Sequence, residues 1–219
     1  MPNQMSVQFI EHAKVCKRPI LDIGAAFGVA SIPALMNGAR VVANDLELGH
    51  LQVLLEAVPA ELREGVMPVV GRFPSQLGFI DAGLDAIHTS NVLHFLRGIE
   101  FDLGAALMYR WLGRGGKVFI QTGSPYVGHL QRFIPLFEER KAAGLLWPGE
   151  FNDVPSKASE EFAAYLPPFL NLVDPEILTR SFSDAGFKVE FVGFYRRHGL
   201  SPELCYDGRE QVGLIASKP

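Results

Sequence analysis

The sequence contains little of what several protein classes require. Its two cysteines, Cys16 and Cys205, are too few for a disulfide framework in 219 residues and favour free thiols in a reducing compartment. No apolar run reaches the roughly 18 residues that span a bilayer. Residues 1–17 lack the apolar stretch of a secretory signal. We therefore expect a cytoplasmic protein that has no membrane partner.

Positive charge and clustered metal ligands are also scarce. The sequence has 20 Lys and Arg against 24 Asp and Glu, a formal net charge of -4, whereas a dedicated nucleic-acid binder normally shows a basic patch. Histidines and cysteines do not cluster as they do in a structural zinc site. Hydrophobic residues make up 48% and aromatic residues 11%, which excludes global disorder and supplies a sizeable core. We expect a small-molecule partner rather than nucleic acid, and a monomer or homodimer.

Apolar strand-like runs alternate with helix-like segments. This alternation predicts right-handed crossovers and a mostly parallel sheet. The fold class is therefore α/β: a single domain over residues 1–219 with a doubly wound, Rossmann-like sheet of seven strands. Only about 15 residues separate the last two strands, which predicts an antiparallel hairpin at the sheet edge. The predicted strands are 19–24, 39–44, 67–72, 84–90, 116–122, 186–195 and 211–217; the predicted helices are 7–14, 28–36, 48–58, 101–112 and 174–184.

Residues 124–173 form a segment too long for an ordinary crossover between a strand and a helix. A long structureless loop is uncommon in a compact domain, so we predict a helical, aromatic-rich lid inserted here, with helices near 126–142 and 156–166. Such aromatic residues more often form a core than line a pocket, but their number favours an apolar, partly aromatic ligand. They are Tyr126, Phe133, Phe137, Trp147, Phe151, Phe162, Tyr165 and Phe169.

A small-residue turn follows the first predicted strand. Residues 20–28 read Ile-Leu-Asp-Ile-Gly-Ala-Ala-Phe-Gly, in which Gly24 and Gly28 permit positive φ or close approach of a ligand. In open α/β sheets the ligand lies at the carboxyl ends of the strands, where this turn is expected. Asp45 ends the second strand, and a carboxylate there can accept two hydrogen bonds from ribose hydroxyls.

Two classes of cofactor use such a turn. A dinucleotide requires the spacing G-x-G-x-x-G for its pyrophosphate, which this turn does not have. Asp22, two residues before the first glycine, would repel a pyrophosphate but attract the ammonium group of S-adenosylmethionine, which carries no phosphate. The residues therefore favour S-adenosylmethionine, and an NAD-dependent oxidoreductase is the weaker alternative.

The motifs in this order resemble the class I S-adenosylmethionine-dependent methyltransferases. The resemblance covers about residues 19–123 and 174–217, and it implies in-line methyl transfer to a small molecule. A non-catalytic protein that keeps the fold and the cofactor is the alternative. The chain departs from the family at Ala26, where a middle glycine is usual, and at Arg72-Phe73, where an acid near adenine is common. The matching segments are 22–28, Asp45, 84–96, 112–120 and 174–187.

The resemblance also implies roles for residues at the strand ends. Asp22 would hold the methionine amino group, directly or through water, and Asp45 would bind the ribose diol. Leu46 would flank the adenine. Because the usual acid near adenine is absent, two alternatives stay open: Phe73 stacks on the base, or a backbone group replaces the acid. Asn91, with Ser90, would face the sulfonium. The full predicted cofactor set is Asp22, Gly24, Ala25, Ala26, Phe27, Gly28, Asp45, Leu46, Arg72, Phe73, Ser90 and Asn91.

The ends of the fourth and fifth strands carry no carboxylates, since they read Ser-Asn at 90–91 and Gln-Thr-Gly-Ser at 121–124. We therefore predict no metal. A carboxylate or thiolate acceptor needs no base, whereas a hydroxyl or carbon acid requires a general base. His94, Tyr126 and His129 are the catalytic candidates, because they follow the fourth and fifth strands.

Overall fold

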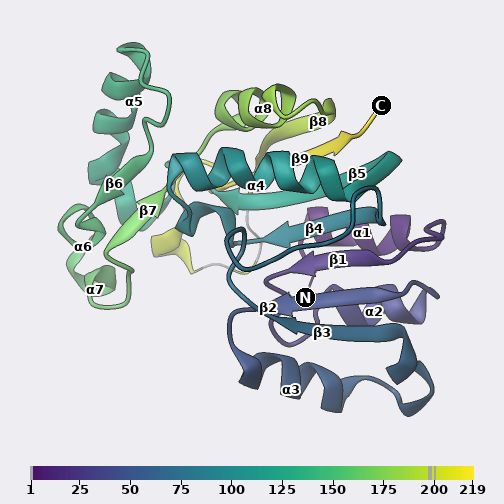
Figure 1. Ribbon diagram of the computed structural model, residues 1–219. Helices are drawn as coiled ribbons and strands as arrows, with labels where there is room; N and C mark the ends of the chain where they lie inside the picture. The colour runs from purple at the N-terminus through teal and green to yellow at the C-terminus, as the bar shows by residue number, and fades with distance from the viewer. Residues whose placement is uncertain (1, 197–198, 200) are drawn as a thin grey trace.

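The computed structural model describes residues 2–196, 199 and 201–219. Within them, seven strands form one sheet in the order β3-β2-β1-β4-β5-β9-β8. Strands β1 to β5 pair in parallel, whereas β9 runs antiparallel to β5 and to β8. The predicted α/β sheet with an antiparallel edge hairpin is confirmed (Figure 1). The strands are β1 (Ile20–Ile23), β2 (Val41–Asp45), β3 (Val66–Val70), β4 (Leu84–Ser90), β5 (Leu112–Gly123), β8 (Lys188–Tyr195) and β9 (Gln211–Ser217).

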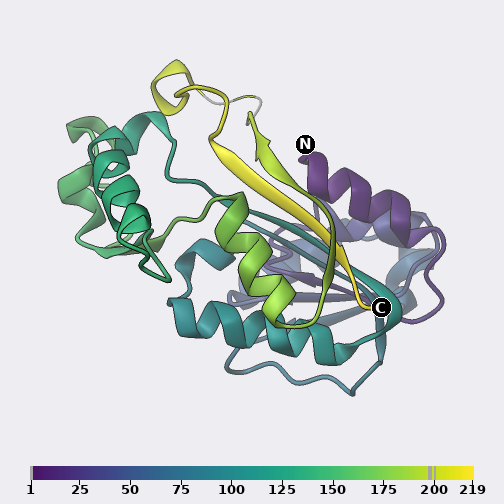
Figure 2. The ribbon, with the colours of Figure 1, turned by 90° about the horizontal axis from the view of Figure 1, so that it is seen from above.

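Helices cover both faces of this sheet (Figure 2). Successive side chains of a strand point to opposite faces, so Ile20 joins one core cluster and Leu21 the other. The helices α1, α2 and α3 pack on the first face, where Phe9 and Leu54 are fully buried, and α4 and α8 pack on the second around Trp111. These helices are α1 (Gln4–Ala13), α2 (Ser31–Met36), α3 (Leu48–Ala57), α4 (Gly98–Trp111) and α8 (Pro175–Asp184).

The helix boundaries follow the local signals in the sequence. The carboxylate of Asp174 accepts a hydrogen bond of 2.9 Å from the backbone N–H of Ile177, which caps α8 just before its first proline. Asn3 caps α1 in the same way through Ser6. Helix α2 begins at Ser31, three residues later than predicted, because residues 25–30 form the turn that follows β1.

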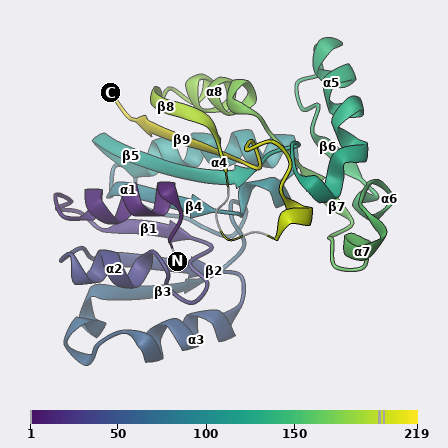
Figure 3. The ribbon, with the colours of Figure 1, turned by 180° about the vertical axis from the view of Figure 1, so that it is seen from behind.

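The insertion between β5 and α8 lies beyond the end of the sheet to which β1 and β4 point (Figures 1 and 3). It contains the predicted helices only in part, because its second helix is broken at Ala158, whose backbone is extended. It also contains a two-stranded antiparallel ribbon that the sequence did not predict. Its elements are a 3-10 helix (Gly128–Phe133), α5 (Ile134–Ala142), β6 (Glu150–Asn152), α6 (Val154–Lys157), α7 (Glu160–Ala163) and β7 (Phe169–Asn171).

The aromatic residues of the insertion pack mainly on one another and on α4. The rings of Phe133 and Phe151 stack with centroids 3.8 Å apart, and Trp147 contacts Phe101 of α4. Tyr165 is the exception, with 85% of its surface exposed. The aromatic content of the insertion therefore reflects a local core.

Every helix among the described residues is too short or too polar to span a bilayer. Cys16 and Cys205 are free thiols. In the same part of the chain, His, Cys, Asp and Glu side chains form no group that could hold a metal ion.

Candidate functional site

The turn after β1 has a backbone that requires glycine at its ends. Gly24 has φ of 73° and Gly28 has φ of 85°, both in the left-handed region. A Cβ atom on Gly24 would lie 2.3 Å from Cγ2 of Val92, so a side chain there would collide with the turn after β4. Between them, Ala26 also adopts a positive φ, 44°, at the position where the family usually has glycine. The turn therefore has the conformation of a glycine-rich turn without the middle glycine.

Asp45, at the end of β2, is bound to this turn. Its Oδ2 accepts a hydrogen bond of 2.9 Å from the backbone N–H of Ala26, and its Oδ1 accepts one of 3.0 Å from the backbone N–H of Glu47. Nδ1 of His50 lies 3.2 Å from Oδ1. A carboxylate has about four acceptor positions, so Asp45 keeps acceptor capacity while its orientation is fixed by the backbone.

A cavity of about 650 Å³, here called the edge cavity, opens between the ends of β1, β2 and β4. Eight of the twelve predicted cofactor residues line it: Gly24, Ala26, Asp45, Leu46, Arg72, Phe73, Ser90 and Asn91. The sequence reasoning missed the remaining lining residues, which are neighbours of the predicted ones along the chain or lie in the first turns of the following helices. They are Ile23, Asn44, Glu47, His50, Gly71, Val92, Phe95 and Leu96.

Four predicted cofactor residues do not line the edge cavity. The backbone N–H of Ala25 donates to the carbonyl of Asn44 below the turn. Phe27 is 53% exposed, and Gly28 packs against α3. Asp22 is 99% buried and both of its carboxylate oxygens are occupied by protein side chains.

Asp22 belongs to a buried chain of hydrogen bonds that joins α1 to the turn. Its Oδ2 accepts from Oγ of Ser31 at 2.6 Å, and its Oδ1 lies 2.7 Å from Nδ1 of His88. Nε2 of the same imidazole lies 3.0 Å from Oγ of Ser6 in α1. His88 is buried within β4, and its imidazole orients Asp22. This placement makes Asp22 a support of the turn and not part of the cavity wall.

The turn after β4 separates the edge cavity from a second one. Asn91 has φ of 59°, and its backbone N–H donates to the carbonyl of Gln121. Its Oδ1 accepts a hydrogen bond of 3.2 Å from Nε2 of Gln121. Oγ of Ser90 accepts a hydrogen bond from Asn3, which precedes α1. Both sides of this turn are therefore held by neighbouring elements.

The second cavity, here called the lid cavity, has a volume of about 310 Å³ and lies between the sheet edge and the insertion. It shares Asn91 and Phe95 with the edge cavity, so the two are neighbours. Two of the three catalytic candidates, His94 and His129, line it. The lining is Asn91, His94, Phe95, Gly123, Ser124, Val127, His129, Leu130, Leu166, Pro167, Leu170, Leu172, Leu204 and Gln211.

The hydrogen bonds of His94 decide which of its nitrogens carries a proton. The backbone N–H of Gly123 donates to Nδ1 at 3.2 Å, so Nδ1 is an acceptor and the neutral ring carries its hydrogen on Nε2. The hydroxyl of Thr122 is 3.2 Å from the same nitrogen. In this tautomer His94 is a hydrogen-bond donor at Nε2, and its role as general base stays a prediction.

Tyr126, the third catalytic candidate, is not among the residues that line either cavity. Its side chain is buried in the insertion, and its hydroxyl donates to the carboxylate of Glu138. Burial and this carboxylate raise the pKa of Tyr126 well above its usual value. The guanidinium of Arg209 lies 3.6 Å from the centre of the ring. The enclosure of the ring by these partners does not favour a catalytic role, which stays a prediction.

His129 has a different environment. Its imidazole makes no hydrogen bond to any residue that the structure describes, and its Nδ1 is buried without a partner. Burial lowers its pKa, so the ring is neutral at pH 7. The ring rests on Phe162, and its carbonyl accepts from the backbone N–H of Ser159. The imidazole of His129 is therefore fixed in place at the lid cavity, and its hydrogen-bonding capacity is not satisfied by any described residue.

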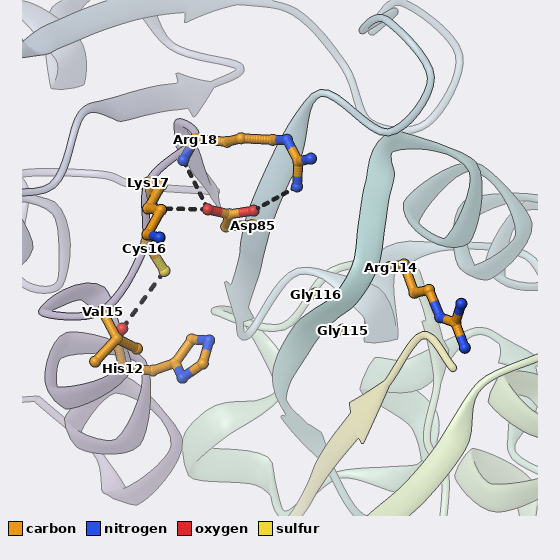
Figure 4. Close-up of a pocket in the computed structure, with 9 residues that line it drawn as sticks. All are labelled: His12, Val15, Cys16, Lys17, Arg18, Asp85, Arg114, Gly115 and Gly116. Atoms are coloured by element: carbon orange, nitrogen blue, oxygen red, sulfur yellow. Dashed lines mark hydrogen bonds and ion pairs between the residues drawn. The ribbon is translucent and has the colours of Figure 1, made fainter.

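A further cavity, of about 360 Å³, lies at the opposite, amino end of the strands (Figure 4). Its central carboxylate, Asp85, accepts hydrogen bonds from the backbone N–H groups of Lys17 and Arg18 and from the Arg18 guanidinium. Burial raises the pKa of the nearby Cys16 thiol to about 11, which leaves it unreactive at pH 7. These contacts fasten the segment after α1 to β4, and ligands of parallel sheets bind at the other end.

No family model matches the chain, and no curated protein matches it. Solved structures do. An S-adenosylmethionine-dependent methyltransferase from Mesorhizobium loti is 14% identical, with a TM-score of 0.69 over 99% of both chains. The chain has the fold of the S-adenosylmethionine-dependent methyltransferases. A putative methyltransferase of this kind from Listeria monocytogenes gives 13% identity and a TM-score of 0.69 over 98% of both chains. The glycopeptide N-methyltransferase MtfA in complex with S-adenosylmethionine gives 17% identity and a TM-score of 0.63 over 98% of this chain and 92% of MtfA.

Proposed function

We propose that this chain is an S-adenosylmethionine-dependent methyltransferase that acts on a small molecule. The observation that carries the proposal is the oriented carboxylate of Asp45 at the mouth of the turn after β1. It is held by the N–H of Ala26, has free acceptor capacity and lies in the wall of the 650 Å³ edge cavity. A ribose diol is the ligand group that such a carboxylate suits.

The hydrogen bonds of the turn favour S-adenosylmethionine over a dinucleotide. A pyrophosphate needs several free backbone N–H groups at this position. Here the N–H groups of Ala25, Ala26 and Gly28 donate to Asn44, Asp45 and Ala25 respectively. The lining contains both Glu47 and Arg72, so it is the occupied N–H groups that disfavour a phosphate. A cofactor with a positive sulfonium and no phosphate fits these residues.

Different residues of the edge cavity then bind different parts of the cofactor. Asp45 holds the ribose, while Leu46 and Phe73 form apolar walls for the adenine. Gly24 brings the backbone close to the methionine part. Asn91, between the two cavities, lies where the sulfonium would meet the acceptor. Bound S-adenosylmethionine supplies an activated methyl group, so the chain contributes alignment and exclusion of water, which account for much of the rate in such a displacement.

The small-molecule acceptor is supported by the size and position of the lid cavity. Its volume of about 310 Å³ is at the lower limit of ordinary ligand pockets. It adjoins the edge cavity at Asn91 and Phe95, so that an acceptor in it would meet the donor there. The insertion supplies eight of the fourteen residues that line this cavity, and we propose that it serves as the lid that excludes water.

Calorimetric titration with S-adenosylhomocysteine tests the cofactor assignment. We expect micromolar binding by the wild type and at least about a tenfold loss in Asp45→Ala, because one hydrogen bond to a charged acceptor contributes about 1.5–3 kcal/mol. Asp45→Asn, which keeps one acceptor oxygen, should lose less. Asp81→Ala, which removes an exposed carboxylate paired with Arg110, is the matched control. Unchanged affinity in Asp45→Ala, or saturable binding of NADH instead, would contradict the assignment.

A further inference from the structure

The residues that line the lid cavity limit the chemical class of the methyl acceptor more narrowly than the cavity volume does. We propose that it binds a small, uncharged compound with an acidic hydroxyl, of the phenol or enol type, and that His129 accepts the hydroxyl proton during methyl transfer. This inference rests on the proposed function and identifies the acceptor class and the base.

The first argument is the absence of charge. Among the described residues that line the lid cavity there is no Asp, Glu, Lys or Arg. A carboxylate or ammonium group brought into this space would lose its water without gaining a partner, which costs several kcal/mol. A neutral acceptor is therefore favoured.

The second argument is the pattern of unused polar atoms. Gln211 is 95% buried, and its Oε1 has no hydrogen-bond partner among the described residues. Nδ1 of His129 is also buried without a hydrogen-bond partner among the described residues. By contrast, Ser124 both donates and accepts hydrogen bonds within the protein. Leaving a buried acceptor unpaired is unfavourable, so a ligand that donates a hydrogen bond to this wall would be bound more tightly than one that does not.

The third argument is the apolar remainder of the lining. Val127, Leu130, Leu170 and Leu172 supply an aliphatic wall, and all four are buried. None of the eight aromatic side chains of the insertion takes part. The expectation of an apolar, partly aromatic acceptor stays a prediction; in this cavity a flat ring would pack against aliphatic groups.

A neutral imidazole is suited to remove the proton of such a hydroxyl. The lowered pKa of His129 keeps one ring nitrogen free to accept a proton at pH 7. In the proposed step the O–H bond breaks and its proton passes to His129. The oxygen forms the new bond to the methyl carbon as the sulfonium–methyl bond breaks, and that electron pair stays on sulfur. The imidazolium later releases its proton to water, so the products are a methyl ether and S-adenosylhomocysteine.

Three compounds of similar size and different charge test the acceptor class. They are 4-ethylphenol, 4-ethylbenzoate and 4-ethylbenzylamine, titrated separately into the complex with S-adenosylhomocysteine. We expect the phenol to bind at least tenfold more tightly than either charged compound. Equal or tighter binding of a charged compound would overturn the inference.

Variants at the cavity wall locate the binding. Leu166→Trp and Leu204→Trp enlarge half-buried side chains of the lining from two different segments, and each should weaken 4-ethylphenol binding at least tenfold. Tyr165→Trp, at an 85% exposed neighbour, is the matched control and should bind like the wild type. Affinity for S-adenosylhomocysteine within twofold of the wild type shows that a variant is folded. Unaltered phenol binding in both folded cavity variants contradicts the proposed location.

The role of His129 is tested by comparing the effects of its substitution on kcat and on KM. In His129→Asn we expect methyl transfer to 4-ethylphenol to fall at least about 100-fold in kcat, as for loss of a general base, with KM changed less than threefold. An unchanged kcat would remove His129 from the reaction. If the protein binds S-adenosylhomocysteine but none of the three compounds, only this inference fails. If it does not bind S-adenosylhomocysteine, the proposed function fails as well.

Discussion

Replacing His88 by leucine should destabilise the protein more than its position inside a strand suggests. The side chains of His88 and Asp22 are 4% and 2% exposed, and their polar atoms are 2.7 Å apart. Leucine fills much of the imidazole volume but offers no hydrogen bond. Oδ1 of Asp22 would then be buried without its partner, while Oδ2 would keep only Ser31.

The magnitude follows from the burial of this pair. Leaving a buried acceptor unsatisfied costs about 1–3 kcal/mol, and more for a charged group, against a total free energy of unfolding of about 5–15 kcal/mol for a typical domain. Ser6→Ala removes only the hydrogen bond of 3.0 Å at the far nitrogen of the ring and should cost about 1 kcal/mol. The two variants therefore separate the loss of Asp22's partner from a smaller change in the same chain.

Urea unfolding of four proteins measures the effect. Wild type, His88→Leu, Asp22→Leu and the double variant form a cycle in which the double variant should be at least about 1 kcal/mol more stable than additivity predicts. A cost below about 1 kcal/mol for His88→Leu, or additive costs in the cycle, would refute the claim that Asp22 depends on this imidazole.

Two further predictions concern groups outside the cavities. Burial by itself raises the pKa of Asp85, but hydrogen bonds from the backbone and guanidinium of Arg18 and from Lys17 outweigh it and lower the pKa. Asp85→Asn should therefore reduce the free energy of unfolding by about 1–2 kcal/mol at pH 7. This difference should vanish as the pH falls through that lowered pKa, as followed by urea unfolding at several pH values. Tyr126→Phe should leave methyl transfer within twofold, in a radiolabel assay, while lowering the melting temperature because Glu138 loses its donor; a tenfold loss of activity would support a catalytic role for Tyr126.

The sheet could be predicted because its signals are local. Each strand is a short apolar run bounded by turn residues, and each main helix carries a cap or an apolar face, as Asp174 and Asn37-Gly38 illustrate. The position of the edge cavity could be predicted for the same reason, because the carboxyl ends of the parallel strands lie together at one end of the sheet. Most of its predicted residues are strand-end residues, and these are the ones that line it.

The features that could not be predicted depend on contacts between residues that are far apart in the sequence. His88 and Ser6 are 82 positions apart, and nothing near either residue in the sequence indicates their hydrogen bond. Gln211 enters the lid cavity because β9 runs between β5 and β8, an order that the hairpin alone does not specify. The three-residue strands β6 and β7 are too short to show any periodicity. Aromatic content indicated a core in the insertion but could not show which face the cavity would occupy.

The missing middle glycine is explained by the bond that the turn makes to β2. Alanine in the left-handed region costs about 1–2 kcal/mol relative to a relaxed backbone, and Ala26 is held there with φ of 44°. The same conformation directs its N–H to Oδ2 of Asp45 at 2.9 Å, and a hydrogen bond to a charged acceptor contributes about 1.5–3 kcal/mol, enough to offset the strain. That bond also orients the carboxylate that we assign to the ribose and removes an N–H that a phosphate would need. The departure from the glycine pattern is therefore compatible with a nucleoside site and unfavourable to a pyrophosphate site.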